Sequence, residues 1–117
     1  MHNSKLIRIQ KYESRITNLL NDFINKEIYN PKLKFAKIMY VRLSSDYSAL
    51  KIFVDCLEQD KLDSLVEKLN DNSNIFRTHL AHNFDFKRAP SVKFLKDETM
   101  SRVQEIEDIL NNIKNKG

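Results

Sequence analysis

The chain has 117 residues, of which 41% are hydrophobic and 31% charged, and its net charge is +4 at pH 7. This length suffices for one core without metal or disulfide support, so we expect residues 1–117 to form a single domain. No apolar run approaches the roughly 20 residues that span a bilayer, no secretory signal is recognisable, and Cys56 is the only cysteine, so we expect a cytoplasmic protein without a membrane partner.

The first predicted element is an amphipathic helix over residues 5–28, in which apolar residues recur at spacings of three and four. Its apolar stripe consists of Ile9, Tyr12, Ile16, Leu19, Leu20, Phe23, Ile24 and Ile28. Four cations lie on a flank beside this stripe, namely Lys5, Arg8, Lys11 and Arg15. The helix is expected to end before Pro31, because the residue that precedes a proline is disfavoured in the α region.

Two strands are predicted over residues 35–43 and 48–55, where β-branched and aromatic residues are frequent. The segment "SSDYS" between them supplies turn residues, so an antiparallel hairpin is the simplest connection. One face of this hairpin is expected to stay in water, because the strands carry Lys37, Arg42 and Lys51.

Two short helices follow the hairpin. Residues 59–70 carry apolar side chains at positions i, i+3, i+4 and i+7. The segment "NDNSN" at 70–74 should interrupt the helix, because Asn, Asp and Ser favour caps and turns. A second helix is then predicted through "IFRTHLAHNF", with Phe76, Leu80 and Phe84 facing inward.

A third strand is predicted over residues 91–95, with Pro90 at its start because proline cannot donate to a sheet ladder. The final helix, 99–115, has an apolar stripe of two heptads, too few to favour a coiled coil over packing onto the sheet. This stripe consists of Val103, Ile106, Leu110 and Ile113. The element order predicts an α+β sandwich in which helices cover a three-stranded sheet.

The charges alternate along the chain in four segments. Residues 1–42 carry a balance of +6, residues 43–76 of −4, residues 77–96 of +4 and residues 97–117 of −2. If the two basic segments meet in the fold, they form one positive face, which is the electrostatic pattern of a nucleic-acid-binding protein.

Residues suited to catalysis or metal binding are scarce. The only glycine is Gly117, so the sequence has no glycine-rich loop that could hold a nucleotide phosphate. His79 and His82 are half of a zinc site at most, and we interpret them as surface residues of a helix. Cys56 is interpreted as a buried or half-buried apolar residue. We therefore expect no enzyme, metal or cofactor.

Four segments resemble the ribosome-binding factor A family, a bacterial family of small-subunit assembly factors. The segment "FKRAPSVKFLKD" is similar to the family signature and matches it at Pro90, Val92, Phe94 and Asp97. Further similar segments are "IFRTHLA" at 75–81, "NPKL" at 30–33 and "SSDYSALKIFV" at 44–54, where Tyr47 takes the place of a leucine. The similarity covers roughly residues 5–115, and it departs at the break between the paired helices, where the family has a small residue or Gly.

The resemblance implies a type II KH-like α-β-β-α-(kink)-α-β sandwich, with a core at about 5–96 and an added C-terminal helix at about 99–115. Ordinary KH modules hold RNA with a GxxG loop, which this sequence lacks. Surface cations are therefore expected to bind the RNA, namely Arg8, Lys11, Arg15, Arg77, Lys87 and Arg88. Pro90, Val92 and Phe94 are expected to be structural, and Asp97 to cap the last helix.

The function implied by the resemblance is that of a non-catalytic ribosome biogenesis factor. It would bind the immature 30S small ribosomal subunit through 16S rRNA, assist its maturation and be associated with cold adaptation. We expect a monomer without a small-molecule substrate. Two alternatives stay open: a free-standing KH-like module for small or messenger RNA, and a protein-interaction domain that uses the last helix.

Overall fold

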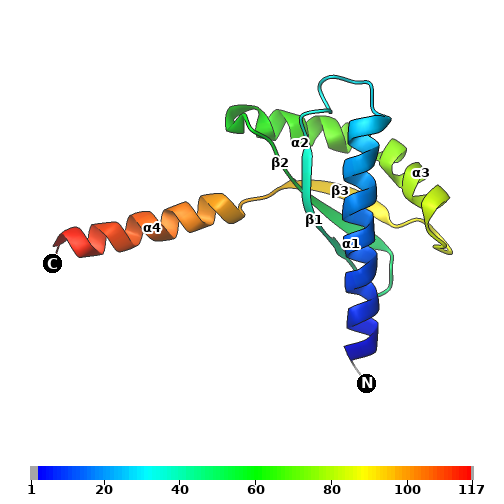
Figure 1. Cartoon of the computed structure of the whole chain (residues 1–117), viewed down its shortest axis with the longest axis horizontal. Coiled ribbons are helices and arrows are strands. Elements are labelled where there is room, and N and C mark those ends of the chain that lie inside the picture. The colour runs from blue at the N-terminus through cyan, green and yellow to red at the C-terminus, as the bar shows by residue number, and fades with distance from the viewer. Residues whose placement is uncertain (1–2, 117) are drawn as a thin grey trace.

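The helices and strands follow the predicted order (Figure 1). The computed structural model describes residues 3–116. Its elements are α1 (Asn3–Lys26), β1 (Lys37–Leu43), β2 (Ala49–Asp55), the short 3-10 helix η1 (Gln59–Lys61), α2 (Leu62–Asp71), α3 (Ser73–Asn83), β3 (Ser91–Lys96) and α4 (Thr99–Lys116). The predicted break between the paired helices is present but shorter than expected, since α2 and α3 are separated by Asn72 alone.

The break is stabilised by its own asparagine. The side-chain amide of Asn72 donates to the carbonyl of Lys68 at 2.8 Å, and its backbone N–H donates to the same carbonyl at 3.1 Å. The backbone of Asn72 has φ −106°, so the kink forms without a residue in the left-handed region. A glycine is therefore not required at this position.

The three strands form one mixed sheet in the order β1-β2-β3. β1 pairs antiparallel with β2, and β2 pairs parallel with β3, which α2 and α3 connect. A register shift between Ile38 and Tyr40 marks a bulge in β1. The register places six buried side chains of β1 and β2 on one face, namely Ile38, Val41, Leu43, Leu50, Ile52 and Val54.

The core lies between this face and the first three helices. α1 packs on β1, whereas α2 and α3 pack on β3. The α1 stripe contributes Ile16, Leu20 and Ile24, which are all fully buried, as the helical spacing predicted. Across the core, the ring of Phe76 on α3 meets that of Phe94 on β3 edge to face, with 4.9 Å between centroids.

Both edges of the sheet are closed by asparagine side chains from helices. Asn21 on α1 donates to the carbonyl of Ile38 and accepts from its N–H, both at 2.9 Å. Asn70 on α2 does the same for Phe94, donating at 3.0 Å and accepting at 2.8 Å. Each asparagine thus takes the place of a neighbouring strand for one edge residue, which protects the edge from pairing with another chain.

The opposite face of the sheet carries polar and aromatic side chains, as alternation along the strands predicts. Arg42, Lys51 and Lys93 are neighbours across the three strands and are exposed. Beside them, the rings of Tyr40 and Phe53 stack at 4.5 Å, and the guanidinium of Arg42 lies 4.7 Å from the Tyr40 centroid.

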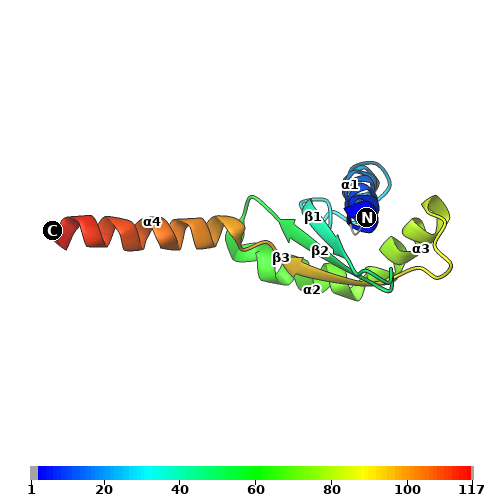
Figure 2. The same cartoon turned by 90° about the horizontal axis from the view of Figure 1, so that it is seen from below.

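The expectation that the last helix packs onto the sheet was wrong. α4 extends away from the other elements in both views (Figures 1 and 2). Its apolar residues Val103, Ile106, Ile109, Leu110 and Ile113 are 42–63% exposed. Their spacing makes the helix amphipathic, but spacing alone does not determine which surface, if any, covers the apolar side.

Candidate nucleic-acid interface

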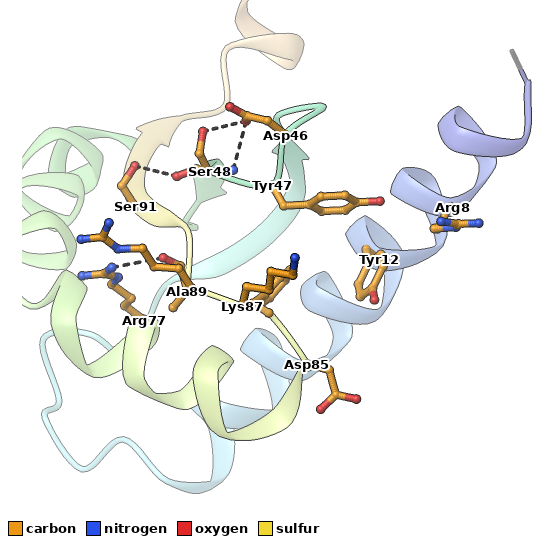
Figure 3. A pocket seen from close by; sticks show the side chains of 12 residues that line it. Arg8, Tyr12, Asp46, Tyr47, Ser48, Arg77, Asp85, Lys87, Ala89 and Ser91 are labelled. Carbon is orange, nitrogen blue, oxygen red and sulfur yellow. Dashed lines mark hydrogen bonds between the residues drawn. The ribbon is translucent and has the colours of Figure 1, made fainter.

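A pocket of about 740 Å³ lies between the N-terminal half of α1, the turn that joins β1 to β2, and the segment before β3 (Figure 3). Four of the six cations predicted to bind RNA line it, namely Arg8, Arg77, Lys87 and Arg88. Arg8 comes from the first basic segment of the sequence and the other three from the second. The fold therefore brings the two basic segments together at this pocket, which we call the basic pocket.

The other two predicted cations lie outside the lining of the basic pocket. Lys11 is exposed on α1. Arg15 is also exposed, and its guanidinium lies 4.8 Å from the ring centroid of Phe84 and 5.8 Å from that of Tyr12. This arrangement is a cation–π contact, which holds the charge of Arg15 beside aromatic residues next to the basic pocket.

Arg77 reaches from α3 to the segment that precedes β3. Its Nη2 donates to the carbonyl of Ala89 at 3.1 Å, so the guanidinium fixes the backbone beside Arg88. Its Nε is buried and has no hydrogen-bond partner among residues 3–116. Arg77 therefore positions the segment before β3 through its hydrogen bond to Ala89.

The beginning of β3 is joined to the turn before β2. The backbone N–H of Ser91 donates to the carbonyl of Ser48 at 2.9 Å. Pro90 and Phe94 are buried, and Val92 is half-buried on the same face as Phe94. After the strand, Asp97 accepts hydrogen bonds from the N–H and the hydroxyl of Thr99, at 3.0 and 2.6 Å, where α4 begins.

An aromatic cluster forms the apolar wall of this region, and the sequence interpretation missed it. It consists of Tyr12, Tyr47, Phe84 and Phe86, with ring centroids 5.6–6.5 Å apart. Three of the four line the basic pocket, the exception being Phe84. The signal in the sequence was the presence of aromatic residues next to charged ones in "DYS" and "FDFKR".

The turn between β1 and β2 is organised around Asp46. Its carboxylate accepts hydrogen bonds from the hydroxyl of Ser48 at 2.7 Å, the N–H of Ser48 at 3.1 Å and the hydroxyl of Ser44 at 2.8 Å. These hydrogen bonds, that from the Ser48 hydroxyl first, lower the pKa of Asp46 to about 2. The carboxylate is thus committed to the turn and stays ionised at neutral pH.

The charges of the basic pocket favour an anionic ligand. Four cations face two carboxylates, those of Asp46 and Asp85. Lys87 and Arg88 are exposed, so their charged groups are accessible from solvent. Accessible Lys and Arg in a concave surface are suited to phosphate groups, and aromatic rings beside them are suited to bases.

The histidines and the cysteine that were considered for metal binding or reactivity have ordinary packing contacts instead. His82 is exposed, as interpreted, whereas His79 is only partly exposed: its ring stacks on that of Phe23 with 4.0 Å between centroids, and its side chain is 19% exposed. Cys56 is half-buried as expected, and burial raises the pKa of its thiol. In the described part of the chain, no three His, Cys, Asp or Glu side chains are grouped so that they could hold a metal ion.

Within residues 3–116, no helix combines the length and the apolar character that a bilayer-spanning segment needs.

The chain is similar in sequence to known ribosome-binding factor A proteins. The family model for ribosome-binding factor A matches residues 8–110. A ribosome-binding factor A from Malacoplasma penetrans is 36% identical over 110 residues, which cover 94% of this chain and 95% of the relative.

Solved structures agree with the fold. The solution structure of a Thermotoga maritima protein, assigned as a candidate ribosome binding factor A, is 30% identical with a TM-score of 0.70, and the match covers 79% of this chain and 89% of that protein. Thermus thermophilus ribosome binding factor A, fitted as a homology model into a cryo-EM map of a complex with the 30S subunit, is 23% identical with a TM-score of 0.58, covering 73% of this chain and 90% of that one. The predicted α+β, KH-like fold with three strands is confirmed. The chain belongs to the ribosome-binding factor A family.

Proposed function

We propose that this protein binds the immature 30S small ribosomal subunit through 16S rRNA and assists its maturation. The observation that carries the proposal is the basic pocket, where Arg8, Arg77, Lys87 and Arg88 converge from segments far apart in the sequence. Family membership supports it, since a relative from Thermus thermophilus is described in a complex with the 30S subunit.

Phosphate contacts supply the affinity in this account. Lys87 and Arg88 neutralise phosphates of the RNA and release bound counterions, so the affinity falls as salt rises. Phosphate contacts alone carry little sequence information. Selectivity for the small subunit then depends on the shape of the folded RNA, which places phosphates where the cations of the rigid fold can reach them.

The wider role follows from the family and is part of the proposal. The protein acts without catalysis, in the cytoplasm, as a monomer that leaves once the subunit has matured. Residues 1–117 act as one domain, and the requirement for the protein is greatest in the cold. Lys11 and Arg15 extend the RNA-binding surface along α1 beyond the basic pocket.

Co-sedimentation tests the proposal. The purified protein is mixed with isolated small subunits, large subunits or joined ribosomes, at low and at high salt. We expect the protein to pellet with free small subunits and to lose this binding steeply as salt rises. Equal pelleting with all three particles, or none, would overturn the proposal and favour a module for small or messenger RNA.

A further inference from the structure

Tyr47 has an unusual backbone conformation for its residue type. It lies in the turn between β1 and β2 with φ 62°, and no other non-glycine residue among 3–116 has a positive φ. A bulky residue is an outlier in this region of conformational space, which Gly or Asn normally occupies in such turns. Strained residues of this kind persist where the surrounding structure fixes them, and they cluster at binding sites.

The surroundings of Tyr47 do fix it. Its backbone N–H donates to the carbonyl of Ser44 at 2.9 Å, and Asp46 ties the flanking serines together. Its ring lies 5.7 Å from that of Tyr12, edge to face, and 6.5 Å from that of Phe86, at an angle of 46°. The strained turn therefore directs an aromatic ring toward the basic pocket and holds it there (Figure 3).

The ring of Tyr47 is half-buried and packs partly against the core, so only its uncovered part can meet a ligand. Its contacts with Tyr12 and Phe86 are edge-to-face and tilted, and no parallel ring covers it within the described residues. The aromatic pair on the open face of the sheet differs in this respect. Tyr40 and Phe53 stack on one another at 4.5 Å, and the guanidinium of Arg42 lies 4.7 Å from the Tyr40 centroid, so each ring already has a stacked partner.

Cations stand beside this ring in the same pocket. Lys87 and Arg88 are exposed there. The pocket volume of about 740 Å³ is within the range of small-ligand sites. An aromatic face next to phosphate-binding cations is the combination that recognises an unpaired nucleotide, because bases inside a duplex stack on each other and are not accessible.

We propose that the basic pocket receives one unpaired nucleotide of RNA, with its base against the ring of Tyr47 and its phosphate at Lys87 and Arg88. The inference rests on the proposed RNA-binding function and gives the pocket a ligand class. It predicts that this protein distinguishes RNA containing an extruded nucleotide from perfect duplex.

Two RNA hairpins test this inference, identical except that one carries a single unpaired adenosine in its stem. Their dissociation constants are measured by fluorescence anisotropy at one fixed salt concentration. We expect the wild-type protein to bind the bulged hairpin about tenfold more tightly, as one base stacked on an aromatic ring allows. Tyr47→Leu removes the ring and keeps apolar bulk, so it should abolish this preference.

Tyr29→Leu is the matched control, because Tyr29 is 86% exposed and does not line the basic pocket. It should keep the full preference. A second measurement uses the wild-type protein alone, in case Tyr47→Leu does not fold: the ring protons of Tyr47 should shift in NMR spectra with the bulged hairpin and not with the duplex.

Equal affinity of the wild-type protein for the two hairpins, or no binding to either, would overturn the inference. So would a full preference in a folded Tyr47→Leu variant. If the protein pellets selectively with small subunits but shows no preference between hairpins, the proposed function stands and this inference fails. A clear preference without selective pelleting would support the nucleotide pocket and overturn the small-subunit proposal.

Discussion

The guanidinium of Arg77 donates a hydrogen bond of 3.1 Å to the carbonyl of Ala89, which joins α3 to the segment before β3. Lys87 and Arg88 precede this carbonyl directly, so Arg77 determines where their backbone lies. Arg77 was predicted to touch RNA because of its charge, and it also makes a structural hydrogen bond within the protein.

Replacing Arg77 with methionine tests this role, because methionine keeps an unbranched apolar stem and loses the donors. Arg77→Met should lower the free energy of unfolding in urea by about 1–2 kcal/mol, since the Ala89 carbonyl loses a charged donor. His82→Ala is the control on the same helix, where the exposed side chain should contribute less than about 0.5 kcal/mol. Equal effects of the two variants would show that Arg77 does not fix the loop.

Asn21 provides a second stability test, at the edge of the sheet. Asn21→Ala removes both hydrogen bonds to Ile38, and we expect a loss of about 2 kcal/mol in urea unfolding, near 1 kcal/mol for each bond. Asn18 lies one turn earlier on α1 and is exposed. Asn18→Ala should therefore be neutral or slightly stabilising, because alanine favours helix. A neutral Asn21→Ala would mean that β1 needs no partner at its outer edge.

The turn at Asp46 should depend on pH in a defined direction. Its pKa is lowered to about 2, so the ionised carboxylate stabilises the turn fully above its ordinary pKa of 3.8. This contribution is lost as the pH falls through about 2. A titration of the Asp46 carboxyl carbon by NMR should show a midpoint near 2.

The two serines provide the control for that titration. In Ser44→Ala/Ser48→Ala, both hydroxyl donors are missing, so the midpoint should move up toward 3.8. A midpoint near 3.8 in the wild-type protein would contradict the hydrogen-bonded turn.

The exposed apolar residues of α4 should contribute little to the stability of the protein. Ile106→Gln/Leu110→Gln should change the free energy of unfolding by less than about 0.5 kcal/mol, as at other surface positions. Leu69→Ala on α2 is the comparison, since this fully buried side chain should cost about 2–5 kcal/mol when truncated. A loss well above 1 kcal/mol in the α4 variant would show that the helix packs on the rest of the protein.

Much of the fold could be predicted because it depends on local periodicity. The spacing of Ile16, Leu20 and Ile24 determines the buried side of α1, and the alternation of Val92 and Phe94 determines the buried face of β3. The placement of α4 could not be predicted, because an apolar stripe indicates amphipathic character but not its partner.

The basic pocket, too, could be predicted only in part from the sequence. Charge identified Arg8, Lys87 and Arg88 as candidates, and the fold brings them to one pocket. The bond from Arg77 to Ala89 and the ring cluster of Tyr12, Tyr47 and Phe86 join separate elements of the fold, so spacing within one element does not show that these residues meet. Asn21 and Asn70 likewise look like ordinary polar helix residues until the strand edges are placed beside them.

The most direct test of the RNA-binding surface compares two double variants of equal charge change. Lys87→Ala/Arg88→Ala removes two cations of the basic pocket, and Lys32→Ala/Lys34→Ala removes two exposed cations of the loop after α1. That loop follows the C-terminal end of α1 (Figure 1), whereas Arg8 belongs to the N-terminal half of this helix.

The measurement is the salt dependence of binding to isolated small ribosomal subunits. We expect Lys87→Ala/Arg88→Ala to weaken binding and to reduce the slope of log K against log salt by about 1.4–1.8, the value for two lost phosphate contacts. Lys32→Ala/Lys34→Ala should behave as the wild type does. If the two variants weaken binding equally, or neither does, the basic pocket is not the RNA-binding surface.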